Sequence, residues 1–77
     1  MEYWERIKGL REDRDLTQID MARYLNIAQN TYSQYENGKR ELPINILIQI
    51  CRYFNVSSDY ILGLSNEKKQ KWMFIEG

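Results

Sequence analysis

The sequence predicts an all-α fold of five helices, and three observations lead to this prediction. Apolar residues recur at intervals of three and four along most of the chain, the spacing that places them on one helix face. Capping and turn residues divide this pattern into five segments. No stretch alternates apolar and polar residues as a half-buried β-strand does. At 77 residues, the chain is long enough for one small domain.

The first two helices are separated by a cluster of charged residues. The first is predicted over residues 2–13, with apolar positions at Tyr3, Ile7 and Leu10. Thr17 starts the second, because its hydroxyl suits the N-cap and Asp20 can complete a capping box. Asn26 is expected to end it, since asparagine tolerates the left-handed conformation. The inward stripe of this helix is Met21, Ala22 and Leu25.

A basic loop joins the third helix to the fourth. The third is predicted over residues 28–36, with Tyr32 and Tyr35 turned inward and Asn37-Gly38 as a stop. Pro43 suits the first turn of the fourth helix, which is apolar over so much of its surface that we expect it at the centre of the core. Its predicted inward stripe is Ile44, Leu47, Ile48, Cys51 and Phe54, with Ile46 and Ile50 beside it.

A short fifth helix is predicted over residues 58–62, capped by Asn55-Val56-Ser57 and stopped by Gly63. Residues 1–63 are thus assigned to one domain and residues 64–77 to a C-terminal tail or extra helix. The tail contains a run of large apolar residues that a compact domain would not leave in water. This run can fold back on its own core, dock on a second subunit, or lead into a larger effector domain. Its members are Trp72, Met73, Phe74 and Ile75.

Composition argues against several function classes. The chain has no His and only one Cys, which removes the commonest general base, an internal disulfide and a multi-cysteine zinc site. We expect Cys51 to be an inert core residue. Since no glycine-rich phosphate loop is present either, we expect no enzyme, cofactor, metal or small-molecule ligand. Neither a secretory signal nor a run of ~20 apolar residues is found, so we expect a cytoplasmic protein with no membrane partner.

The charge balance limits how this chain can bind a nucleic acid. Eleven basic residues are offset by 11 acidic ones, and no segment has the basic excess of a purely electrostatic binder. DNA binding would need a few well-placed cations together with neutral hydrogen-bond donors.

The predicted second and third helices have the layout of a helix-turn-helix. About three residues separate them, and the small Ala22 lets them cross closely. In this motif the second helix enters the major groove of DNA. Its outward residues here are polar and uncharged, and Gln and Asn match the N6/N7 edge of adenine with one donor and one acceptor. The predicted base-reading residues are Gln29, Asn30, Ser33 and Gln34.

Five motifs occur together: Leu16-Thr17-Gln18, Met21-Ala22, Leu25-Asn26-Ile27, the run from Tyr35 to Arg40, and the run from Phe54 to Gly63. In combination they resemble the Cro/repressor-type (XRE-like) helix-turn-helix family, from Ile7 to Gly63 without a gap. The resemblance implies a compact lambda-repressor-like DNA-binding domain. It also implies a transcriptional regulator, more often a repressor than an activator, that acts as a homodimer on a palindromic operator.

By position, the resemblance implies roles for individual residues. Gln29, Asn30 and Gln34 match base readers, and the expected phosphate contacts are Thr17, Gln18, Asn37, Lys39 and Arg40. Arg11 and Glu36 match an orienting pair, which we expect at the surface with a contribution of ~0–1 kcal/mol. Ala28 departs from the family, because a Ser or Thr normally caps the third helix. The alternative function is a protein-interaction module on the same fold, such as an antitoxin or antirepressor partner, acting through the apolar tail.

Overall fold

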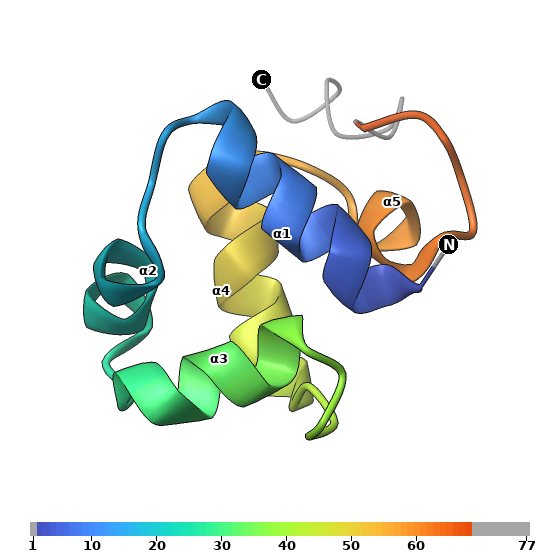
Figure 1. Ribbon diagram of the computed structural model, residues 1–77. Helices are drawn as coiled ribbons and strands as arrows, with labels where there is room; N and C mark the ends of the chain where they lie inside the picture. The colour runs from blue at the N-terminus through green and yellow to red at the C-terminus, as the bar shows by residue number, and fades with distance from the viewer. Residues whose placement is uncertain (1, 69–77) are drawn as a thin grey trace.

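The computed structural model describes residues 2–68 of the chain. In this range every regular element is a helix, in the order α1 (Tyr3–Asp13), α2 (Gln18–Leu25), α3 (Gln29–Glu36), α4 (Ile44–Phe54) and α5 (Ser58–Leu62) (Figure 1). The predicted all-α, five-helix fold is therefore confirmed. None of the helices in the described range is long and apolar enough to cross a membrane. Trp72, Met73, Phe74 and Ile75 lie outside the described residues.

Side-chain caps determine where α2 and α5 begin. The Thr17 hydroxyl accepts a hydrogen bond from the Asp20 N–H at 3.1 Å, and the Asp20 carboxylate accepts one from the Thr17 N–H at 2.9 Å. This is the predicted capping box. The Ser57 hydroxyl accepts a hydrogen bond from the Tyr60 N–H at the start of α5. Asn26, with a φ of 57°, ends α2 in the left-handed conformation that the sequence predicts.

The inward face of α4 differs from the predicted stripe. Ile44 is 71% exposed and Ile48 is 44% exposed, so placing these two in the core was wrong. At about 100° per residue, the buried positions share one arc of the helix, and Ile44 and Ile48 lie on the opposite side. Cys51 lies at the edge of the buried arc and is half-buried. The buried residues of α4 are Ile46, Leu47, Ile50 and Phe54.

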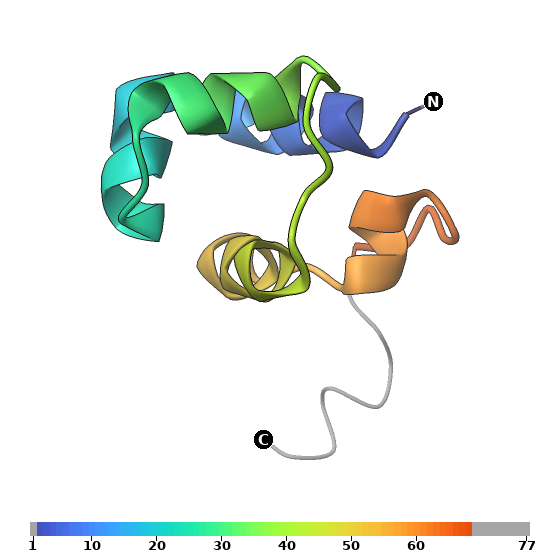
Figure 2. The same ribbon diagram turned by 90° about the horizontal axis from the view of Figure 1, so that it is seen from below.

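The five helices enclose one core. α1 packs against α3 and α5, α4 packs against α2 and α5, and α2 packs against α3. Ile7, Met21, Tyr32, Ile50 and Ile61 are fully buried where these helices meet. Seen from below in Figure 2, α3 lies in front of α1, and no other element of residues 2–68 covers its outer side.

Candidate nucleic-acid interface

The outer face of α3 presents four neutral polar side chains. On the inner face, Tyr32 is fully buried and Tyr35 is 5% exposed, which fixes the rotation of the helix about its axis. The opposite face is consequently turned to solvent. On this face Gln29 and Asn30 are exposed, and Ser33 and Gln34 are half-exposed. Within residues 2–68, the structure thus brings all four predicted base-reading residues to one solvent-exposed surface: Gln29, Asn30, Ser33 and Gln34.

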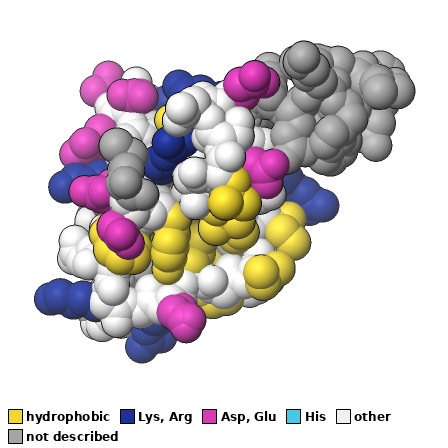
Figure 3. Space-filling model, turned by 90° about the vertical axis from the view of Figure 1, so that its right-hand side faces the viewer, with side chains coloured by type: hydrophobic (Ala, Val, Ile, Leu, Met, Phe, Trp, Pro, Cys, Tyr) yellow, Lys and Arg dark blue, Asp and Glu magenta, His cyan; other side chains and the backbone are white. Residues whose placement is uncertain are grey.

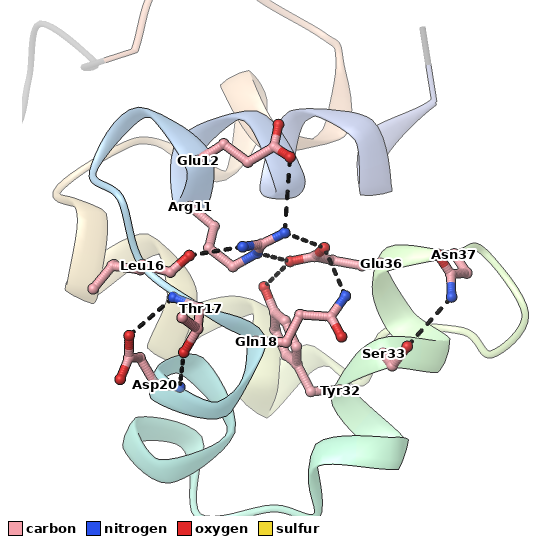
Figure 4. Close-up of polar contacts among 10 residues, drawn as sticks. All are labelled: Arg11, Glu12, Leu16, Thr17, Gln18, Asp20, Tyr32, Ser33, Glu36 and Asn37. Carbon is pink, nitrogen blue, oxygen red and sulfur yellow. Dashed lines mark hydrogen bonds and ion pairs between the residues drawn. The ribbon is translucent and has the colours of Figure 1, made fainter.

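Glu36, the last residue of α3, has a buried carboxylate. The Glu36 side chain is 1% exposed, and its oxygens accept hydrogen bonds from three different side chains (Figure 4). Arg11 donates from Nε at 2.6 Å and from Nη2 at 3.2 Å, while the Tyr32 hydroxyl donates at 2.5 Å. The Gln18 amide donates at 3.2 Å. Arg11 also donates from Nη1 to the Leu16 carbonyl at 2.7 Å. Through Arg11, Gln18 and Glu36, the network joins α1, α2 and α3.

Arg11 and Glu36 form the expected pair, but the expectation that this pair lies at the surface was wrong. The Arg11 side chain is only 12% exposed, and the pair is shielded from water. The hydrogen bond to Glu36 raises the pKa of Arg11, and burial together with the bond to Glu36 raises the pKa of Tyr32 far above its usual value. Both groups therefore keep their protons and act as donors. Removing one partner of a buried pair costs far more than removing one partner of a surface pair.

Because charged residues are rarely buried, the sequence led us to expect Glu36 at the surface. One sequence pattern did indicate that Glu36 faces the core. Glu36 follows Tyr32 by four residues, so the two share one helix face, and Tyr32 was already predicted to face the core.

Thr17 and Gln18, at the start of α2, were predicted to contact phosphate, and both already have partners inside the protein. The Thr17 hydroxyl oxygen is the N-cap acceptor, and one Gln18 amide proton is directed at Glu36. A primary amide carries two protons, so the Gln18 side chain retains one donor for an outside acceptor. Gln18 is half-buried and Thr17 is exposed at the start of α2.

The loop after α3 carries the remaining predicted phosphate contacts. Asn37, Lys39 and Arg40 are all exposed. The Asn37 amide donates to the Ser33 hydroxyl at 3.3 Å, and the Lys39 backbone N–H donates to the Gln34 carbonyl at 2.9 Å. Among residues 2–68, neither the Lys39 nor the Arg40 side chain forms an ion pair. Both cations remain available to an anionic partner.

Other arginines are used within the fold instead. Arg6 donates to the backbone carbonyls of Tyr60 and Ser65, and Arg14 donates to that of Phe54. With Arg11 bound to Glu36, these arginines on α1 and at its C-cap make contacts within the domain, whereas Lys39 and Arg40 in the loop after α3 are exposed. Composition alone could not distinguish the two groups.

Other functional groups are few in the described chain. No group of three His, Cys, Asp or Glu residues within residues 2–68 could hold a metal ion. Burial raises the pKa of the Cys51 thiol, which lowers its thiolate fraction and its reactivity.

Comparison with known proteins adds a family and several relatives. The helix-turn-helix family model matches residues 7–61. The chain is 44% identical over 57 residues to antitoxin PezA of Streptococcus pneumoniae, covering 74% of this chain and 36% of that protein. It is 35% identical over 69 residues to the uncharacterized HTH-type transcriptional regulator YobD of Bacillus subtilis, covering 90% and 62%. The HTH-type transcriptional regulator ImmR of the same species is 34% identical over 70 residues, covering 91% and 55%. The chain thus spans about a third to three fifths of the length of these relatives.

Two solved structures share the fold. A transcriptional regulator from Listeria innocua superposes with a TM-score of 0.78 at 24% identity, covering 97% of this chain and 70% of that one. The P22 c2 repressor, determined in complex with a synthetic operator, superposes with a TM-score of 0.74 at 22% identity, covering 80% and 94%. These likenesses confirm the predicted repressor-type arrangement of helices.

Proposed function

This chain belongs to the helix-turn-helix family, and from that premise we propose that it is a sequence-specific, double-stranded DNA-binding regulator of transcription that acts as a repressor. The observation that carries the proposal is the outer face of α3, where, among residues 2–68, neutral amides are exposed to solvent beside two cations without an ion pair, Lys39 and Arg40. The proposal involves no enzymatic step, cofactor or metal, and it requires the cytoplasmic location expected from the sequence.

In the proposed complex α3 enters the major groove, where base edges present donors and acceptors. Gln29, Asn30 and Gln34 read bases, and Ser33 assists. An amide pairs with an adenine edge through one donor and one acceptor, and each good pair of this kind discriminates by about 1–3 kcal/mol. The proposed base readers are neutral, which is consistent with the zero net charge of the chain.

Phosphate contacts set the register of the protein on the duplex. We assign Gln18 and Thr17 to one backbone segment, at the start of α2, and Asn37, Lys39 and Arg40 to another. The buried Arg11–Glu36 pair serves this arrangement, because it withdraws a carboxylate from the end of α3 that would otherwise repel phosphate.

We further propose a homodimer on a palindromic operator, with half-sites about one helical turn, ~34 Å, apart. Exposed apolar side chains support a second subunit: Ile44 and Ile48 on α4, and Leu62 and Leu64 at the end of α5. Figure 3 shows hydrophobic side chains gathered on the side where α5 and the loop before α4 lie. In this proposal residues 1–63 form the DNA-binding domain and residues 64–77 form a dimerisation segment that includes Trp72, Met73, Phe74 and Ile75.

Binding-site selection from random duplex DNA tests the proposal. We expect enrichment of two inverted half-sites with a fixed spacing of about 10 base pairs between their centres. No enrichment would contradict a sequence-specific role.

The alternative, a protein-interaction module such as an antitoxin, is favoured by the match to PezA but has less support, because YobD and ImmR are both named transcriptional regulators. Deletion of residues 72–75 separates the two functions. A pure adaptor shows no operator affinity before or after the deletion, whereas a regulator shows it before.

A further inference from the structure

Two aromatic residues at the start of α1 contact both ends of the loop that follows α3. At one end, Gly38 has a φ of 73°, and a Cβ placed on it would lie 2.6 Å from Trp4 Cε2 and 2.7 Å from Trp4 Cζ2. The indole ring therefore lies against the Gly38 backbone and leaves no room for a side chain. At the other end, the Leu42 N–H donates to the Tyr3 hydroxyl at 3.3 Å.

The two aromatic side chains form one unit. The rings of Tyr3 and Trp4 pack edge to face with centroids 5.1 Å apart, a favoured aromatic geometry. Tyr3 also packs against the hydrophobic core, which anchors the unit to the body of the domain.

Between these two anchors the loop has little other support. Its last backbone hydrogen bond to α3 is the one from Lys39 to Gln34, and within residues 2–68 no further backbone hydrogen bond holds Arg40 or Glu41. A glycine at positive φ is the residue with the greatest freedom to change conformation. The position of the two exposed cations, Lys39 and Arg40, consequently depends on what fixes Gly38 and Leu42.

We propose that Tyr3 and Trp4 are positioning residues for the DNA backbone contacts of this loop. They touch no DNA themselves, and they hold the loop so that Lys39 and Arg40 meet phosphate without first being ordered. This inference rests on the proposed DNA-binding function and adds to it two residues that lie outside the helix-turn-helix.

The first test uses the protein without DNA. Tyr3→Phe removes the acceptor for the Leu42 N–H and keeps the ring, so hydrogen exchange at the Leu42 amide should become about three- to tenfold faster. Gly9→Ala is the matched control in the same helix, because a Cβ at Gly9 meets nothing within 4 Å. Unchanged exchange at Leu42 in Tyr3→Phe would overturn the proposal.

The second test uses the duplex obtained by selection. Trp4→Ala should weaken binding to all sequences alike by about three- to tenfold and reduce the salt slope by about one per loop, with the preferred half-site unchanged. Trp4→Phe should recover much of the affinity and of the salt slope, whereas Gly9→Ala should leave both quantities at their wild-type values. If Trp4→Ala changes neither affinity nor slope, or changes the preferred half-site instead, the positioning role is wrong.

A double-mutant cycle separates positioning from general destabilisation. Gly38→Ala should weaken binding less in the Trp4→Ala chain than in the wild type. The three atoms nearest to the new Cβ all belong to the Trp4 ring, whereas the strain of an alanine at a φ of 73° is common to both chains. Additive losses would contradict a direct contact. If the wild-type chain binds no duplex, the proposed function fails, whereas exchange at Leu42 still decides whether the aromatic pair holds the loop.

Discussion

Gln18 Nε2 lies 3.2 Å from Glu36 Oε1, so the first residue of α2 is hydrogen-bonded to the last residue of α3. The same carboxylate holds Arg11 of α1 and Tyr32 of α3. A side chain proposed to contact phosphate is thereby oriented by the helix proposed to read bases. The two kinds of contact are fixed relative to each other before DNA is met, which reduces the ordering cost of binding.

Arg11→Ala should lower the free energy of unfolding by about 3–5 kcal/mol, because it leaves the Glu36 carboxylate buried without its cation. Urea unfolding measures this change. Arg23→Ala is the control, since Arg23 is exposed, and it should stay within about 0.5 kcal/mol of the wild type. A loss below about 1 kcal/mol for Arg11→Ala would mean that the pair behaves like one at the surface.

Tyr32→Phe should cost about 1–3 kcal/mol, because Glu36 loses its shortest hydrogen bond while the ring still fills the core. Thermal or urea unfolding gives the value. Tyr24→Phe removes a hydroxyl from a 43% exposed tyrosine and should be close to neutral. Equal effects in the two variants would show that the Tyr32 hydroxyl contributes nothing specific.

Asp20 gives the capping box a pH dependence. Hydrogen bonds from the Thr17 backbone and side chain lower the pKa of Asp20 below its ordinary 3.8 in the folded state. A lowered folded-state pKa stabilises the fold above the unfolded-state pKa, and this contribution is lost as pH falls through the folded-state value. The difference in unfolding free energy between wild type and Asp20→Asn should therefore be largest near neutral pH and shrink below about pH 4. A difference that stays constant down to about pH 2 would exclude this linkage.

The salt dependence of DNA binding should be shallow, because the proposed interface has only two cations, the exposed Lys39 and Arg40, to release counterions from the duplex. Lys39→Ala should weaken binding to every sequence alike and reduce the slope by about one for each loop in contact. Affinity measured by fluorescence anisotropy over a range of salt gives both quantities. A wild-type slope as steep as about −10 would contradict an interface built mainly from neutral donors.

Local signals predicted the elements well. Thr17 and Asp20 meet within one helical turn, so the sequence contains everything that the capping box needs. The rotation of α3 about its axis could also be predicted from local sequence, because Tyr32 and Tyr35 are the main apolar positions in an otherwise polar helix.

Contacts between residues far apart in the chain could not be predicted from such local patterns. α4 is apolar on both sides, so periodicity alone could not show that Ile46 faces the core and Ile44 does not. The burial of Glu36 depends on Arg11, and the contact of Trp4 with Gly38 joins residues far apart in the chain. Each of these features is determined by which helices pack together, and a residue's sequence neighbours do not reveal it.

Repeating the selection from random duplexes with Gln34→Ala and Lys39→Ala tests the central claim, that the outer face of α3 reads bases. We predict that Gln34→Ala loses its preference at one base pair of each half-site, worth about 1–3 kcal/mol, with the spacing unchanged. Lys39→Ala should select the wild-type sequence with weaker affinity. If both variants select the wild-type sequence with equal preference at every position, the amides of α3 do not read the operator.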